Sequence, residues 1–414
     1  MADEVIELTF DLFTLPTAQH RAGLAGLTLL VESMRRRKIK IRPEISANSD
    51  RTATVVLTKK TLVSAFNDLY DATTTEVEAT RKRKDNKKRD IRPLREKKRT
   101  DSKTGKQKTV FIYPQVVPKA AFLARFGMPQ LWLKLWSDAI WETLRGLPRT
   151  RIPYGERAEG KTVSEADATW KDLQKFQQLR TRNQIYTVDI ASSVFIGAQA
   201  VNAERVPFRG RADETFLLHF WPVVMGIYVP QIMDRDGQTK FEGYVLVIPD
   251  VSELDGFVHD FPKATAQLRS DLAGYRPRES VISLPQEGGL EYLHHLMKLA
   301  RGKAQRGELA YSLTGVEVYH LQKQGNSIRM LDADRVSVTP RVLEEYEAIR
   351  GRYRDPLFKR QRILNLLRDM PWYWGFDRVF SINDSERFVG SQANWFSADS
   401  RWTFNTELHE GRSV

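Results

Sequence analysis

A dense run of basic residues most constrains how this chain can fold, because like charges at this density cannot be buried in a hydrophobic core. Residues 81–108 contain fifteen Lys and Arg against four Asp and Glu, and residues 35–42 (RRRKIKIR) add six cations and no acid. Without these two segments the net charge of +13 would become −4. Charge concentrated in this way favours binding to the phosphates of nucleic acid over a general role in solubility.

All of the predicted nucleic-acid contacts lie in these two basic elements. A disordered basic tail or a localisation signal remains an alternative, although both elements are internal and adjoin segments with folding patterns. An anionic membrane is disfavoured because no amphipathic helix places large apolar residues opposite the charge. The first element contributes Arg35, Arg36, Arg37, Lys38, Lys40 and Arg42, and the second contributes Arg81, Arg83, Lys87, Lys88, Arg89, Arg92, Arg95, Lys97, Lys98, Arg99, Lys103, Lys106 and Lys108.

The second element has the pattern of a β-hairpin finger. Residues 89–99 are basic with few apolar side chains, residues 109–113 (TVFIY) resemble a strand, and residues 101–106 (DSKTGK) are rich in turn formers. The tip is expected near Gly105, and residues 81–88 are expected to be a disordered lead-in. A finger of this kind buries little apolar area, so we expect nucleic acid to order it.

The remaining patterns predict an α+β fold. A strand is expected at 5–13, a helix from Pro16-Thr17 into the first basic element, a strand at 53–58 and a helix at 62–70. The division expected is an N-terminal α/β region (1–147, with the basic insertion 81–108), a β-rich mixed domain (148–340), and a helical, aromatic-rich segment (341–414). Helical spacing at 118–147 puts Trp132 and Trp136 on one face, where core packing is favoured over base stacking.

The second half is predicted to be richer in strands. Turn signals at 234–237 and 324–326 indicate two hairpins, helical patterns fall at 264–272, 290–300 and 340–368, and aromatic residues crowd the chain after 371. The first hairpin would pair 216–231 with 240–248, and the second 311–322 with 327–338.

The search for catalytic chemistry finds only isolated fragments. Residues 155–162 (GERAEGKT) match the phosphate-cradling pattern GxxxxGK[ST], but the preceding 148–154 is rich in Pro and Arg and predicts a linker instead of the required buried strand. The neighbouring His294 and His295 would point about 100° apart on a helix. Asp332 and Asp334 could hold a metal ion in a nuclease, although acidic residues are common in surface turns. The sequence therefore predicts a protein without catalytic, metal or cofactor sites.

The cellular compartment is predicted from what the sequence lacks. Cysteine is absent, the N-terminus is acidic, and the most apolar run, 216–230, is interrupted by His219, Pro222 and Gly226. It also falls short of the roughly 20 residues that a membrane span requires. We therefore expect a soluble cytoplasmic protein.

One segment resembles a known family. Residues 15–27 (LPTAQHRAGLAGL), after a short strand, are similar to the opening of the large subunit of type I CRISPR Cascade surveillance complexes, particularly the Myxan-type group. The resemblance implies a subunit at the 5′ end of the guide RNA that contacts the flanking motif (PAM) of double-stranded target DNA. It also implies other Cascade subunits as partners, and recruitment of a nuclease-helicase or a transposition adaptor.

The resemblance is incomplete at the other end, and other functions stay open. Large subunits of this kind usually finish in a helical bundle, and no four-helix pattern is evident before Val414, so a separate small subunit is expected to supply it. One alternative is a stand-alone RNA- or DNA-binding protein, such as a transposition or RNA-processing factor. Another is a nuclease or nucleotide hydrolase.

Overall fold

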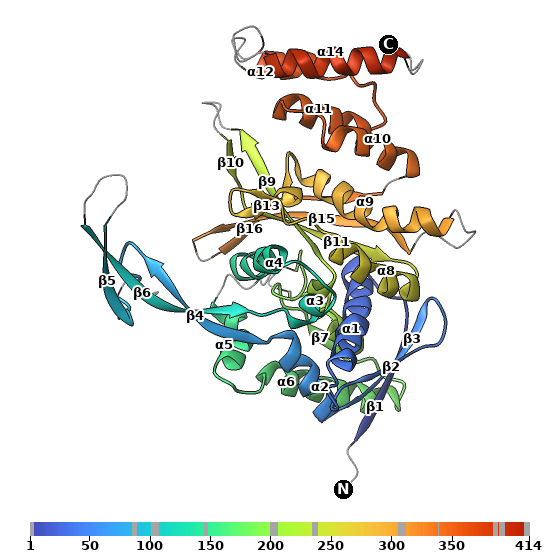
Figure 1. Cartoon of the computed structure of the whole chain (residues 1–414). Helices are drawn as coiled ribbons and strands as arrows, with labels where there is room; N and C mark the ends of the chain where they lie inside the picture. The colour runs from blue at the N-terminus through green and yellow to red at the C-terminus, as the bar shows by residue number, and fades with distance from the viewer. Residues whose placement is uncertain are drawn as a thin grey trace.

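The computed structural model describes residues 4–84, 89–100, 107–144, 148–198, 206–233, 239–304, 312–325, 327–337, 339–383, 388 and 394–409. The fold is α+β, as predicted, with several small sheets, a projecting arm and a stack of helices that carries the C-terminus (Figure 1). No helix within these ranges is long and apolar enough to span a membrane.

The largest sheet forms the centre of the molecule. Its strand order is β10-β9-β11-β15-β16, with β14 (Val281–Ile282) pairing alongside β9. Its strands are β9 (Gly226–Met233), β10 (Thr239–Phe241), β11 (Tyr244–Val251), β15 (Leu313–Gln324) and β16 (Ser327–Val336). The hairpin of β15 and β16 was predicted and is confirmed. The turn expected at 234–237 lies outside the described residues.

Helices cover both faces of this sheet. Helix α9 (Pro285–Ala304) lies on one face, where Gly289 brings it so close that an added Cβ would be 3.1 Å from Val316 and Val318. Helix α1 (Ala18–Arg36) meets the opposite face, since its Arg21 reaches Asp250 on β11. A strand that is covered on both faces has no solvent-exposed face, and β11 is accordingly buried over Val245–Val251.

The N-terminal sheet and its helix follow the sequence prediction closely. Strands β1 (Val5–Asp11), β3 (Thr52–Thr58) and β2 (Glu44–Ala47) pair antiparallel in the order β1-β3-β2. Helix α2 (Lys59–Leu69) begins at a capping box in which Thr58 and Thr61 bind each other's backbone N–H groups. Helix α6 (Ser164–Arg180) packs beside α2.

The basic insertion folds as a three-stranded antiparallel sheet that projects from the body (Figure 1). Its strands are β4 (Ala72–Ala79), β6 (Gln107–Pro118) and β5 (Arg95–Thr100), in the order β4-β6-β5. The predicted hairpin of β5 and β6 is confirmed, and the expected tip near Gly105 lies outside the described residues. The third strand, β4, was not predicted. We call these three strands the finger.

The C-terminal part is a set of packed helices, as the helical pattern predicted. Its helices are α10 (Pro340–Arg350), α11 (Pro356–Leu367), α12 (Phe376–Ile382) and α14 (Asn394–His409). Phe358 of α11, Phe376 and Val379 of α12, and Phe396 of α14 form a core separate from the main one, whereas α10 packs into the main core through Leu343, Tyr346 and Ile349. Aromatic residues supply the contacts among α11, α12 and α14, and the expectation that a separate small subunit supplies a helical bundle stays a prediction.

Three local predictions are also corrected. The predicted linker at 148–161 is a short 3-10 turn, η1 (Pro148–Arg151), followed by α5 (Ile152–Ala158), because Tyr154 is buried in the main core. Residues 216–225, predicted as strand, belong mostly to α7 (Ala212–Leu217) and η2 (Trp221–Val223). Helix α8 (Leu254–Ala266) lies N-terminal to the predicted 264–272, since Glu253 caps it and Pro262 is accommodated inside it.

One main core connects the predicted regions. Its buried side chains run from Ile6 to Leu366, and both Trp132 and Trp136 belong to it, which confirms their predicted packing role. The division at 147 and 340 stays a prediction. The remaining short elements are α3 (Ala121–Arg125), α4 (Gln130–Glu142), β7 (Thr187–Asp189), β8 (Arg209–Arg211), β12 (Leu272–Ala273), β13 (Arg276–Pro277) and η3 (Arg278–Ser280).

Candidate nucleic-acid interface

The strand register sorts the cations of the finger onto its two faces. Arg95 pairs with Ile112, Lys97 with Val110 and Arg99 with Lys108, so these cations share one face. Lys98, opposite Thr109, points to the other face. Strand β5 is exposed along its whole length. Its cations therefore lie on the surface of a projecting sheet, where a polyanion has access to them.

Two of these cations form ion pairs with the strand that was not predicted. Arg95 lies 2.5 Å from Glu76, and Arg99 lies 3.2 Å from Glu78, both acids being on β4. All four side chains are at least two-fifths exposed, and ion pairs of this kind contribute little to stability. In the described part of the chain neither Lys97 nor Lys98 has an acidic partner. The two glutamates reduce the charge of the finger without covering its cations.

The first residues of the insertion are attached to the finger, which corrects the expectation of a disordered lead-in at 81–84. The Arg83 N–H donates to the Tyr113 hydroxyl at 3.0 Å, and its carbonyl accepts from Ile91 N–H at 2.7 Å. The Arg83 guanidinium also lies over the Tyr113 ring, 5.1 Å from its centre. A buried tyrosine on β6 thus provides the anchor that composition alone does not reveal.

A cation that the sequence reading missed lies at the base of the finger. Arg151, at the end of η1, stacks on Trp141 with its guanidinium carbon 4.4 Å from the ring centre. Burial lowers the pKa of Arg151, the Glu142 carboxylate opposes that shift, and the positive charge of Arg83 adds to it. The charge of Arg83 is thus near enough to lower the pKa of Arg151. The Pro- and Arg-rich sequence at 148–151 was the available signal, and it was interpreted as a linker.

The first basic element forms one ion pair with another helix and two along its own helix. Arg37 forms a two-pronged ion pair with Asp68 of α2 at 2.7 and 2.5 Å, which ties the end of α1 to α2. Arg35 and Arg36 both reach Glu32 one turn back, at 2.6 and 2.8 Å. Three of the six cations thus pair with acids of the body; Arg37 is half-buried, whereas Arg35, Arg36, Lys38 and Lys40 stay exposed.

As far as the structure describes them, the two basic elements lie apart and do not form one patch. Figure 1 shows the finger reaching away from the body, whereas α1 lies within it. Arg36 instead packs over the Phe126 ring, 5.5 Å from its centre. Arg42 donates to the Ile39 carbonyl at 2.8 Å. Of the other predicted contacts, Arg81, Arg89, Arg92 and Lys108 are exposed, and Lys87, Lys88, Lys103 and Lys106 lie outside the described residues.

The segment that carries the family resemblance, residues 15–27, packs inside the molecule. Gln19 binds the backbone N–H and carbonyl of Ile196 at 2.9 and 3.0 Å, and Arg21 donates to Asp250 at 2.5 Å. A Cβ added at Gly23 or Gly26 would lie 2.2 or 2.1 Å from a backbone carbonyl oxygen of the neighbouring segment. These residues let α1 approach that segment closely, so their pattern encodes the fold of the subunit.

The fragments that suggested catalysis have structural roles. The phosphate-loop match begins at Gly155 inside α5, the element directly before that helix is the 3-10 turn η1 and not the required strand, and its Lys161 pairs with Glu159 at 2.7 Å. Asp332 and Asp334 both accept hydrogen bonds from Gln286, at 3.2 and 3.0 Å.

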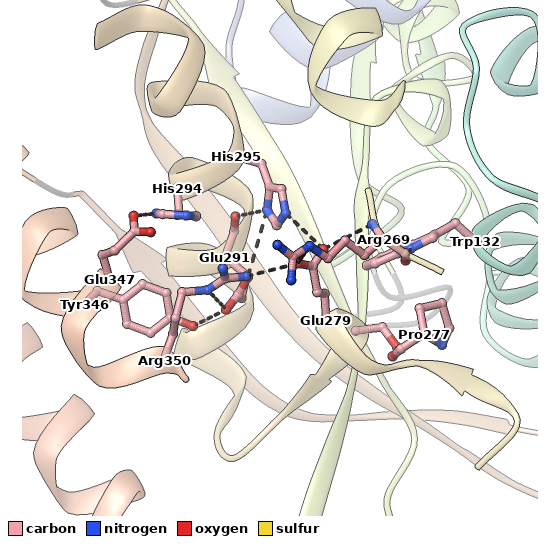
Figure 2. Close-up of polar contacts among 11 residues, drawn as sticks. Trp132, Arg269, Pro277, Glu279, Glu291, His294, His295, Tyr346, Glu347 and Arg350 are labelled. Carbon is pink, nitrogen blue, oxygen red and sulfur yellow. Dashed lines mark hydrogen bonds and ion pairs between the residues drawn. The ribbon is translucent and has the colours of Figure 1, made fainter. Parts of the chain in front are cut away.

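The adjacent histidines also have separate structural partners. His294 contacts Glu347 of α10 at 3.2 Å, whereas His295 contacts Glu279 at 3.3 Å, as Figure 2 shows. Within the described ranges no group of three or more His, Cys, Asp or Glu side chains is placed to hold a metal ion.

An α+β body that carries an exposed basic arm is a type of structure suited to a nucleic-acid-binding subunit. The family model for the type I-B CRISPR Cas8b N-terminal domain matches residues 42–306, and that for the type I-B CRISPR Cas8b C-terminal domain matches residues 313–413. The chain therefore belongs to the type I-B CRISPR Cas8b family and is a large subunit of a type I-B Cascade complex. No curated protein matches it. The predicted resemblance is confirmed, and the narrower Myxan-type grouping stays a prediction.

Proposed function

We propose that this chain is a non-catalytic Cascade subunit that contacts the 5′ end of the guide RNA and the flanking motif of target DNA, with the finger as the DNA clamp. The observation that carries the proposal is strand β5, which is exposed throughout and presents Arg95, Lys97, Lys98 and Arg99 within five residues. Because guide pairing reads the target in complexes of this class, the protein needs mainly to grip backbone and a short flanking motif.

Phosphate binding at the finger has a small internal cost. The pairs of Arg95 with Glu76 and Arg99 with Glu78 are exposed, so a phosphate replaces a weak, solvent-screened partner. Contacts of this kind position the duplex without selecting sequence. Reading of the flanking motif then requires a further side chain at a base edge.

The remaining partners follow from membership of the complex. We propose that the other Cascade subunits and the guide RNA hold the chain in place, and that it recruits a downstream effector, either a nuclease-helicase or a transposition adaptor. The second candidate function, a stand-alone RNA- or DNA-binding protein, would bind its target specifically without guide RNA or partner subunits.

The test is a charge-neutralised finger in the reconstituted complex. The finger variant carries Arg95→Gln, Lys97→Gln, Lys98→Gln and Arg99→Gln. A matched control removes the same four charges, two Arg and two Lys of similar exposure, from the body: Lys59→Gln, Lys134→Gln, Arg209→Gln and Arg341→Gln.

We expect the finger variant to assemble normally and to bind target DNA at least tenfold more weakly at 150 mM salt, since each lost phosphate contact weakens the electrostatic part of binding. The control variant should bind normally. Normal DNA affinity with failed assembly would show that the finger anchors protein or guide RNA, and the clamp would then be wrong. Metal-dependent cleavage of DNA or RNA by the purified chain would overturn the non-catalytic assignment.

A further inference from the structure

A second small hairpin presents an aromatic ring to solvent. Strands β12 and β13 pair Leu272 with Pro277 and Ala273 with Arg276, which leaves Gly274 and Tyr275 as a two-residue turn. Gly274 has φ +66°, the backbone conformation that such a turn favours. Tyr275 is 91% exposed, more than any other large apolar or aromatic side chain in the described ranges. A ring in this position has almost no contacts with its own protein.

The surroundings of the ring are positively charged. Residues 269–279 contain three Arg against Asp271 and Glu279, and the Glu279 carboxylate is half-buried and faces His295 and Arg350. The Arg276 guanidinium lies over the Phe241 ring on β10, 4.2 Å from its centre, and Lys240 precedes that ring. An aromatic side chain among cations is the combination that binds single-stranded nucleic acid, because the ring stacks on a base while the cations hold adjacent phosphates.

The base of this hairpin is held firmly, so Tyr275 is presented on a fixed support. The Trp132 indole N–H donates to the Arg269 carbonyl at 2.7 Å, and the Arg278 N–H donates to the Asp271 carbonyl at 2.6 Å. The Arg269 N–H donates to the Glu279 carboxylate at 3.3 Å. Figure 2 shows Trp132 and Glu279 approaching this backbone from opposite sides.

Glu279 connects the hairpin to the helices behind it. Its carboxylate lies 3.3 Å from the His295 imidazole of α9 and 3.6 Å from the Arg350 guanidinium of α10. Burial raises the pKa of Glu279, but the hydrogen bond with His295 and the nearby positive charges lower it to about 2, so it stays ionised. Preorganisation of this kind reduces the entropy lost when a ligand binds at the tip.

We propose that Tyr275 is a stacking site for one nucleobase of a single-stranded segment of nucleic acid, with Arg276 and Arg278 beside it as phosphate contacts. The proposal rests on the proposed function, because it assumes that the chain binds nucleic acid. It adds a contact to unpaired bases, which the finger, with its exposed cations, does not provide.

The experiment uses the full-length chain and two fluorescent probes, a single strand of about 12 nucleotides and the fully paired duplex of the same sequence. Tyr275→Ala should weaken binding of the single strand by about fivefold or more and leave the salt dependence unchanged, because stacking involves no phosphate. Tyr275→Phe, which keeps the ring, should bind like the wild type. Duplex binding should not change in either variant.

The control is Phe13→Ala, which removes another exposed aromatic ring, 61% exposed and stacked with Arg51, from the turn that follows β1. Unchanged single-strand binding by Tyr275→Ala would overturn the proposal, as would an equal loss in Tyr275→Phe. If Tyr275→Ala keeps single-strand binding but no longer copurifies with Cascade subunits, the ring makes a protein contact and the proposal is also overturned. Failure of the finger variant to lose duplex binding would instead refute the proposed function, so the two failures are distinguishable.

Discussion

Replacing Gly26 with alanine tests whether the LPTAQHRAGLAGL segment acts through close packing. A Cβ at this position would lie 2.1 Å from the Phe220 carbonyl oxygen, so α1 and the neighbouring backbone would have to separate by about 1 Å to reach ordinary contact distance. Overpacking against a buried backbone costs about 3 kcal/mol, and the better helix propensity of alanine returns about 1 kcal/mol. We expect a net loss of about 2 kcal/mol.

The matched control is Gly155→Ala in α5, where no atom outside its neighbours lies within 4 Å of the added Cβ. Here only the propensity gain applies, so the variant should be stabilised by about 0.5–1 kcal/mol. Urea unfolding followed by circular dichroism should show opposite shifts of the midpoint. A Gly26→Ala protein as stable as the wild type would refute the close-packing explanation of the segment.

Three further predictions concern single side chains. Burial and the nearby Arg21 charge lower the pKa of His20 to about 4. Between pH 6.5 and 4 the unfolded imidazole binds a proton and the folded one does not, so the free energy of unfolding should fall by about 3 kcal/mol as the pH is lowered over this range. This fall should be largely absent in His20→Gln, and parallel profiles of unfolding free energy against pH for the two proteins would contradict the prediction. Arg37→Met should lower stability by about 1–2 kcal/mol, because Asp68 loses its two-pronged partner, while DNA affinity stays near that of the wild type; a large loss of DNA affinity without a change in stability would return Arg37 to the binding surface. Lys161→Ala should change neither stability nor any background ATP turnover, and loss of a turnover present in the wild type would restore the phosphate-loop reading.

The sequence predicted the parts of the fold in which local pattern and tertiary packing agree. The alternation at 5–13 and 53–58, the helix that begins after Thr17, and the hairpin at 311–338 all follow from the period of their apolar residues. Residues 216–225 were misread because a helix and a 3-10 turn buried on all sides are as continuously apolar as a buried strand.

The candidate site was predicted in composition but not in geometry. Charge density identified the finger. It could not show that arginines of the first element form ion pairs, because Asp68 lies on another helix and Glu32 lies one turn back on the same helix. Strand β4 had a usable signal in its β-branched Thr73–Thr75 and Val77. Arg151 had none beyond its Pro- and Arg-rich neighbourhood, since its place beside Arg83 arises only from the tertiary fold.

The salt dependence of DNA binding tests the central claim most directly. If the basic elements neutralise about six phosphates, a plot of log affinity against log salt for a duplex with the flanking motif should have a slope near −5. The variant with Gln at Arg95, Lys97, Lys98 and Arg99 removes four of those contacts, so its slope should rise to about −2, while the matched body variant keeps the slope of the wild type. Equal slopes for all three proteins would contradict the account, because the cations of the finger would then make no contact with DNA.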